Sequence, residues 1–270
     1  GLPWCVVKAN STEEVQNVVN LAKEKRMPLI PVSSTQGPRF RGDTIPSQGG
    51  AILDLSGLNK ILNINRKDRM AVIEPGVTFE QLDSALRKEG LRAFKPLMPR
   101  KGKSVLASYL EREPVLVPRD HWDAIDPMVA VEVVFGTGDV FRTGSAAGPP
   151  AELDKQIEAG LSQCFAAGPG STSLSRVLQG AQGTMGVVTW GSVYCGILPE
   201  ISKMFFVASE SLEPLIDLSY RLSRQRLGEE HFIVNGFQLA TMVAEKEEIQ
   251  ARSRNLPTWI LAVNLTASGV

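Results

Sequence analysis

The chain has 270 residues, 43% of them hydrophobic and 21% charged, and its 29 basic side chains balance its 29 acidic ones. This length allows one large or two medium domains, and a net charge of zero gives no general attraction to nucleic acid or acidic lipid. No apolar run is long enough to span a bilayer. The three cysteines share no metal-like spacing, so we expect no metal site and a reducing, cytoplasmic location.

The first third of the chain alternates short strands with two helices. Ser11 and Thr12 begin the first helix as polar caps with acidic residues behind them, and Pro28 follows its end. Thr78 caps the second helix, and Gly90 stops it. We expect strands at residues 3–7, 29–32, 51–55, 61–64 and 70–74.

The middle of the chain is predicted to contain longer strands. The turn residues Gly136 to Gly138 join two apolar runs as a hairpin, and Val187 begins a strand of its own. We expect strands at residues 128–135, 139–143 and 187–197, and helices at residues 104–112 and 152–166.

After Pro199 strands and helices alternate regularly, which suggests a second domain. The expected strands are at residues 203–209, 232–239 and 258–265, and the expected helices at residues 213–227 and 242–255. We therefore predict an α+β fold with one domain at residues 1–200 and another at residues 201–270.

Two loops contain residues that suit an anion. The loop after Val32 is rich in Ser, Thr and Gly, and it separates two apolar strands. Backbone N–H groups in such a loop can converge on a phosphate, because Gly and Ser allow close approach and unusual φ angles. Most Gly/Ser loops only join strands, however, and the second loop, Gln179 to Gly186, is open to the same two interpretations.

Several short motifs occur in one order along the chain. They are Pro31–Thr35, Leu53–Leu55, Glu74–Thr78, Ser104–Leu106, Asp120–Trp122, Glu132–Val134, Arg142–Gly144 and Gln182–Thr189. In this order, over residues 3 to 200, the chain resembles the vanillyl-alcohol oxidase and p-cresol methylhydroxylase (PCMH) family of FAD flavoproteins.

The resemblance implies a PCMH-type FAD-binding domain of two α/β subdomains, followed by the start of an α/β cap domain. It also implies non-covalent FAD, a hydroxylated organic small-molecule substrate, and a partner subunit or homo-oligomer. In the family the substrate-facing residues lie beyond the matched part, so we expect that the chain is not a complete catalytic unit. No catalytic residue is assigned.

The resemblance also assigns cofactor-binding residues. The first loop and the segment after the second helix would line the pyrophosphate, and a later turn would complete the site, although a tight turn before a buried strand explains that turn equally well. The residues are Ser33, Ser34, Thr35, Gln36, Gly37, Arg39, Arg41 and Gly42 in the first loop, Ser104 and Ser108 in the second segment, and Gly183, Gly186 and Val187 in the turn.

Cationic residues replace several glycines of the family pattern. Arg39 and Arg41 stand in the first loop, and Lys101 and Lys103 stand before Ser104. These side chains could neutralise a pyrophosphate, fill its space, or face solvent. If they fill its space, the chain is a flavin-less structural or assembly subunit of the same descent, and this alternative stays open.

The two histidines of the chain are candidates for a functional role. His121 follows Asp120, and the pair could supply a general base, although a hydrogen-bonding or surface role is the simpler interpretation. His231 precedes a strand of the second domain and belongs to none of the matched motifs, so we expect it to be structural.

Overall fold

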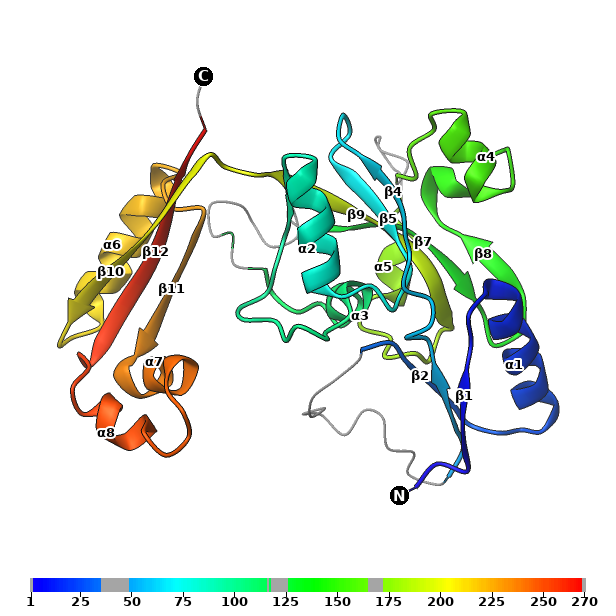
Figure 1. Cartoon of the computed structure of the whole chain (residues 1–270), viewed down its shortest axis with the longest axis horizontal. Helices are drawn as coiled ribbons and strands as arrows, with labels where there is room; N and C mark the ends of the chain where they lie inside the picture. Colours follow the sequence, from blue (N-terminus) through cyan, green and yellow to red (C-terminus); the bar gives the residue numbers. More distant parts are fainter. Residues whose placement is uncertain (1, 35–48, 116, 118–125, 165–171, 269–270) are drawn as a thin grey trace. The chain divides into compact units, whose positions relative to one another are not determined.

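The computed structural model describes residues 2–34, 49–115, 117, 126–164 and 172–268 (Figure 1). Contacts divide the chain into two compact units, residues 1–113 with 126–198, and residues 114–125 with 199–270. The first unit holds two sheets, and the second unit holds one. Within the described residues, no helix combines the length and the hydropathy that a bilayer crossing requires.

A small parallel sheet forms the N-terminal part of the first unit. Its central strand pairs with both neighbours, in the order β1-β3-β2. Helix α1 connects β1 to β2, and Ser11 caps it by accepting a hydrogen bond from the N–H of Glu14 at 3.1 Å. The elements are β1 (Cys5–Lys8), α1 (Thr12–Glu24), β2 (Leu29–Val32) and β3 (Ala51–Asp54).

A larger antiparallel sheet follows in the same unit. It has six strands in the order β4-β5-β9-β7-β8, and β6 pairs with the far end of β9. The strands are β4 (Ile61–Asn65), β5 (Met70–Ile73), β6 (Leu91–Ala93), β7 (Met128–Val134), β8 (Val140–Arg142) and β9 (Val187–Ile197). β9 therefore lies at the centre of the sheet, and β2 and β9 have the bounds that the sequence predicts.

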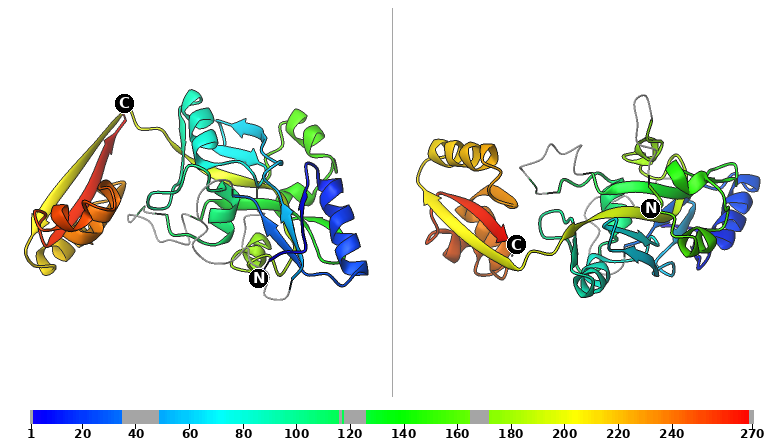
Figure 2. Two further views of the ribbon diagram at one scale, coloured as in Figure 1. Left: turned by 60° about the horizontal axis from the view of Figure 1, so that its bottom comes forward. Right: turned by 90° about the horizontal axis from the view of Figure 1, so that it is seen from above.

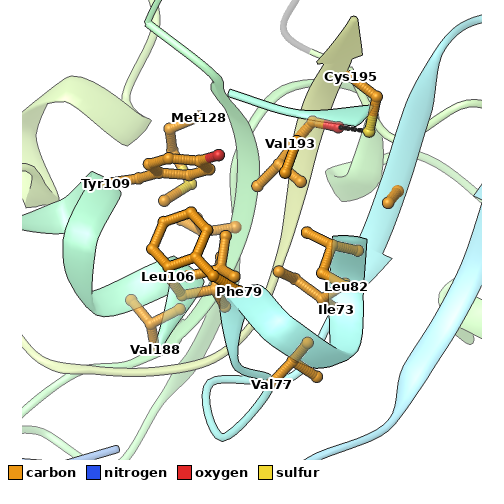
Figure 3. Close-up of a cluster of buried hydrophobic side chains, with 14 of the residues drawn as sticks. Ile73, Val77, Phe79, Leu82, Leu106, Tyr109, Met128, Val188, Val193 and Cys195 are labelled. Atoms are coloured by element: carbon orange, nitrogen blue, oxygen red, sulfur yellow. Dashed lines mark hydrogen bonds between the residues drawn. The ribbon is translucent and has the colours of Figure 1, made fainter. Parts of the chain in front are cut away.

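Three helices cover one face of the large sheet and form the main hydrophobic core. They are α2 (Phe79–Lys88), α3 (Val105–Leu110) and α5 (Ser175–Leu178). Figure 3 shows Phe79 and Tyr109 against each other in this core, with ring centroids 5.9 Å apart in an edge-to-face arrangement. The Tyr109 hydroxyl donates to the carbonyl of Phe94 at 2.5 Å, and burial raises the pKa of Tyr109 well above its ordinary value.

Other elements cover the opposite face of the sheet. A 3-10 helix, Gly144–Ala147, and α4 (Leu153–Glu158) pack there through Ala146 and Leu153. The predicted helix at residues 152–166 is wrong in length, because α4 ends at Glu158. Gly160, with φ +71°, provides the left-handed residue that stops it.

A buried glutamate in the large sheet forms an ion pair within the sheet and a hydrogen bond with α1. The Glu132 side chain on β7 is buried, and its Oε2 accepts from Nε of Arg142 at 2.7 Å. Its Oε1 accepts from the hydroxyls of Thr189 at 2.7 Å and Thr12 at 3.0 Å. The Arg142 guanidinium also lies 5.6 Å from the ring centroid of Trp190. Glu132 therefore has a hydrogen-bond donor from α1, one from β9 and one from β8.

The second unit contains one antiparallel sheet of three strands, in the order β10-β12-β11. Strands β10, yellow, and β12, red, run side by side in both views of Figure 2. Helix α6 packs on this sheet through Leu215, which contacts Leu261 and Val263. The elements are β10 (Ile201–Ser209), α6 (Glu213–Arg224), β11 (Glu230–Asn235), α7 (Gly236–Val243), α8 (Ile249–Ser253) and β12 (Trp259–Ala267).

Two of the predictions for this unit are wrong. The strand expected at residues 232–239 ends at Asn235, and the helix expected at residues 242–255 is two helices, α7 and α8. Asn235 caps α7 by accepting from the N–H of Gln238 at 2.7 Å, and the Gln238 side chain accepts from the N–H of Asn235 at 3.3 Å. This capping box turns an apolar run into a helix start.

His231 has a structural position in the second unit. Its side chain on β11 is buried, and Nε2 lies 2.8 Å from Oγ of Ser219 on α6. Nδ1 is buried without a hydrogen-bond partner among the described residues, and the Gly228 turn passes close beside it. Burial lowers the pKa of His231 below its ordinary value, because the charged imidazolium loses hydration.

This lowered pKa predicts a pH-dependent contribution to stability. The unfolded chain takes up the proton at about pH 6.5, whereas the folded chain takes it up only at lower pH. The stability that neutral His231 contributes is therefore full above pH 6.5 and lost as the pH falls through the folded pKa. Urea unfolding from pH 5 to 8 should show the parent losing its advantage over His231→Gln as the pH falls. A difference that does not vary with pH would contradict this account.

Candidate functional site

Ser34 and Ser104, which lie far apart in the sequence, meet in the structure. The N–H of Ser104 donates to Oγ of Ser34 at 3.1 Å, so the residue that caps α3 is joined to the loop that follows β2. The Ser104 hydroxyl donates to the carbonyl of Pro75 at 2.5 Å and accepts from the N–H of Ala107 at 3.0 Å. Three of the motif segments therefore converge at this junction.

The turn at Pro75–Gly76 fits closely because Gly76 has no side chain. A Cβ atom there would lie 2.7 Å from the carbonyl oxygen of Leu58 and 2.8 Å from that of Ser56. The N–H of Gly76 donates to the same Leu58 carbonyl at 2.6 Å. Because backbone rather than a flexible side chain fills the space, a larger residue would displace the turn and the junction beside it.

Gly183 lies beside β2, and Gly186 lies beside β7. A Cβ on Gly183, which has φ +79°, would lie 3.0 Å from the Pro31 ring at the end of β2. A Cβ on Gly186, which has φ +155°, would lie 2.7 Å from Cγ2 of Val133. Val187 is buried at the start of β9. Packing of the strand explains why both positions are glycine, and the Gly183 turn adjoins the candidate site.

Ser108 and Lys103 have partners inside the protein. Ser108 is fully buried on α3, and its hydroxyl donates to Oε2 of Glu113 at 2.5 Å. Lys103 Nζ lies 2.6 Å from Oε2 of Glu111 and 3.0 Å from Oε1 of Glu113. Both side chains that the resemblance places near a phosphate thus contact carboxylates.

The other predicted cations are divided between the surface and the undescribed part of the chain. Lys101 is exposed, and its Nζ lies 3.8 Å from a carboxylate oxygen of Glu80. The first-loop residues Thr35, Gln36, Gly37, Arg39, Arg41 and Gly42 lie outside the described residues, as do Asp120 and His121. Of the four cations, the structure describes Lys101 and Lys103, and each of them lies near carboxylates of the chain.

Sequence reasoning did not single out the carboxylates of this region. Glu111 and Glu113 follow α3, and no periodic signal links them to Lys103. The Nε2 of Gln179 donates to both oxygens of Asp126 at 2.9 Å, which ties the second Gly-rich loop to the residue before Pro127 and β7. An acid and an amide 53 residues apart give no warning of such a contact.

No metal centre emerges from the described residues, and one of the three thiols is buried. No group of three or more His, Cys, Asp or Glu side chains among them could hold a metal ion. Cys5, Cys164 and Cys195 are free, and burial raises the pKa of the Cys195 thiol to about 12. Cys195 lies in the core shown in Figure 3.

The residue types at the junction suit a diphosphate, which only accepts hydrogen bonds. Ser33 and Ser34 are half-buried just after β2, and the Ser34 hydroxyl accepts the N–H of Ser104. Ser104 is fully buried and its hydroxyl is engaged, so it supports the junction from behind. Small hydroxyl residues and backbone N–H groups at such a loop are the chemistry that phosphate sites use.

Comparison with known proteins identifies similar chains. Residues 3–144 match the family model described as FAD binding domain. The chain is 28% identical over 214 residues to the glycolate oxidase subunit GlcD of Bacillus subtilis. This alignment covers 78% of this chain and 41% of the relative. It is 28% identical over 148 residues to the 4-cresol dehydrogenase [hydroxylating] flavoprotein subunit of Pseudomonas putida. This alignment covers 54% of this chain and 28% of the relative.

Solved structures share the fold. p-Cresol methylhydroxylase with substrate bound gives a TM-score of 0.73 at 21% identity, covering 97% of this chain and 52% of the other. 4-Ethylphenol oxidase from Gulosibacter chungangensis gives a TM-score of 0.74 at 21% identity, covering 97% of this chain and 51% of the other. The α/β architecture is thus that of PCMH-type FAD-binding proteins. The chain spans about half the length of these solved structures and less than half the length of the curated relatives.

Proposed function

The chain belongs to the FAD binding domain family, and on that basis we propose that it is the FAD-holding part of an oxidoreductase for a hydroxylated organic substrate. The observation that carries the proposal is the contact of Ser34 with Ser104, which joins the two segments that a pyrophosphate would touch. The relatives' names support the substrate class, since glycolate and 4-cresol are both hydroxylated organic molecules.

The residues of this chain bind and orient the cofactor. FAD supplies the redox chemistry when bound. The first-loop residues would line the pyrophosphate, namely Ser33, Ser34, Thr35, Gln36, Gly37, Arg39, Arg41 and Gly42, and Ser104 and Ser108 would support it from the second segment. Gly183, Gly186 and Val187 would complete the site at the later turn. The glycine turns keep the backbone close enough for N–H donors to reach the anion.

The proposal also covers the location of the protein in the cell and its partners. We place the protein in the cytoplasm, supported by its free cysteines, and beside a partner subunit or a second copy of itself. The support for a partner is that one relative is named a flavoprotein subunit and another is named a subunit. The cap is the part after residue 200, and substrate would be covered there.

Replacing Arg41 tests how the first loop binds the cofactor. If the arginine contacts the pyrophosphate, Arg41→Gly should weaken FAD binding by about 1.5 to 3 kcal/mol, the range for a hydrogen bond to a charged group. Titration of the purified apoprotein with FAD, followed by flavin fluorescence, gives the dissociation constant. Lys67→Gly, at an exposed position in the turn between β4 and β5, is the matched control and should bind FAD like the parent.

The flavin-less alternative makes the opposite prediction. If the cations fill an empty pocket, Arg41→Gly opens room for backbone approach, and FAD binding should stay equal to that of the parent or improve. A parent chain that takes up no FAD at any concentration would overturn the proposed function itself.

A further inference from the structure

We propose that Glu113, together with Glu111, is a positioning residue of the cofactor site that holds Lys103 and Ser108 in place, and that Lys103 is not a ligand of the bound anion. The proposal rests on the proposed function, because it concerns the same site. It assigns roles to two acidic residues that lie outside every motif of the sequence, and it gives Lys103 a role other than the three that the sequence left open.

The first step of the argument is the ion pair itself. Lys103 immediately precedes Ser104, and its side chain is only 13% exposed. Its Nζ contacts Glu111 at 2.6 Å and Glu113 at 3.0 Å. Because Lys103 lies before α3 and both acids lie after it, the pair connects the two ends of the helix.

The second step is how the chain delivers Glu113. Arg112 follows α3 with φ +56°, the left-handed conformation that ends a helix. Its N–H donates to the Tyr109 carbonyl and the N–H of Glu113 donates to the Ser108 carbonyl, each at 3.1 Å. These two bonds form a Schellman motif, which turns Glu113 back onto the helix, where its Oε2 accepts from the Ser108 hydroxyl at 2.5 Å.

The third step is the energetic consequence of moving Lys103. To reach an anion beside Ser34, the ammonium would have to leave two carboxylates that are only 29% and 25% exposed without this cation. Separating such a partly buried pair is unfavourable, and the anion would have to compensate for it. Lys103 therefore stays with the acids, and its contribution is to hold the start of α3, where the N–H of Ser104 meets Ser34.

The test measures FAD affinity after the two ion contacts are removed from the lysine side, from the acid side, and from both. Lys103→Met removes both contacts, and Glu111→Gln combined with Glu113→Gln removes the same contacts from the acid side. Each should weaken FAD binding about tenfold, and the variant with all three changes should bind like either. Lys103→Arg keeps the charge and should recover most of the affinity. Glu113→Gln preserves shape and an acceptor for Ser108, so the acid-side variant keeps the test valid if Lys103→Met folds poorly.

The control pair is Lys155 with Glu152, which are exposed on and before α4 with 3.1 Å between Nζ and Oε1. Lys155→Met and Glu152→Gln should leave FAD affinity unchanged. The proposal is overturned if Lys103→Met weakens binding while Glu111→Gln combined with Glu113→Gln does not, because Lys103 is then a ligand. It is also overturned if all variants bind like the parent. In both cases the parent binds FAD, whereas a parent that does not bind refutes the proposed function and this inference with it.

Discussion

Arg142→Met is expected to lower the free energy of unfolding by about 3 to 5 kcal/mol, the range for breaking a buried ion pair from one side. Glu132 is 3% exposed, and Arg142 lies 2.7 Å from its Oε2. Without the guanidinium the carboxylate keeps only the hydroxyls of Thr12 and Thr189 as partners in the described contacts. Urea denaturation of the full chain, followed by circular dichroism, measures the loss.

Two further variants separate burial from charge. Arg221→Met breaks an exposed i,i+4 pair with Asp217 on α6, so it should cost less than about 1 kcal/mol. Arg142→Met combined with Glu132→Leu removes the stranded charge as well, and it should be more stable than Arg142→Met alone. A double variant less stable than that single variant would show that Glu132 matters mainly through its hydroxyl partners.

Gly186→Ala is expected to destabilise the protein by about 3 kcal/mol, since it combines overpacking with an unfavourable backbone conformation. The new Cβ would lie 2.7 Å from both Cγ2 of Val133 and the carbonyl oxygen of Val134, and φ is +155°. Thermal or urea unfolding gives the loss directly. The same substitution tests whether Gly186 is a packing residue or a residue that only the cofactor needs.

Two other glycines provide matched controls. Gly160 has φ +71° and open space around its Cβ position, so Gly160→Ala isolates the backbone cost, about 1 to 2 kcal/mol. Gly136 has open space and no positive φ, so Gly136→Ala should change stability by about 0.5 kcal/mol or less. If Gly186→Ala retains the stability of the parent and loses only FAD affinity, the packing explanation is wrong.

The sequence predicted regular elements well where one signal dominated. β9 has its predicted bounds because a long stretch rich in β-branched and aromatic residues follows a glycine turn. The prediction failed at β11 and α7, where the apolar run Phe232 to Leu239 outweighed the capping box at Asn235 and Gln238. Asn235 and Gln238 have the three-residue spacing of a capping box in the sequence, and this spacing marks the boundary between β11 and α7.

The site was less predictable than the fold. The meeting of Ser34 with Ser104 depends on chain topology over 70 residues, and only the resemblance to a family brought the two together. The partners of Lys103 were not predictable, because they require Arg112 in a left-handed conformation that its residue type disfavours. A count of cations in the sequence therefore does not show that Lys103 contacts two carboxylates of its own chain.

The central place of β9 has a consequence for synthesis on the ribosome. β5 and β7 both pair with β9, in a register that sets Met70 opposite Tyr194, so neither can find its inner neighbour until residues 187–197 have emerged. Until then the β4–β5 and β7–β8 hairpins each present an open apolar edge, which is where nascent chains aggregate. The inner edges of β5 and β7 therefore stay unpaired until translation has passed β9.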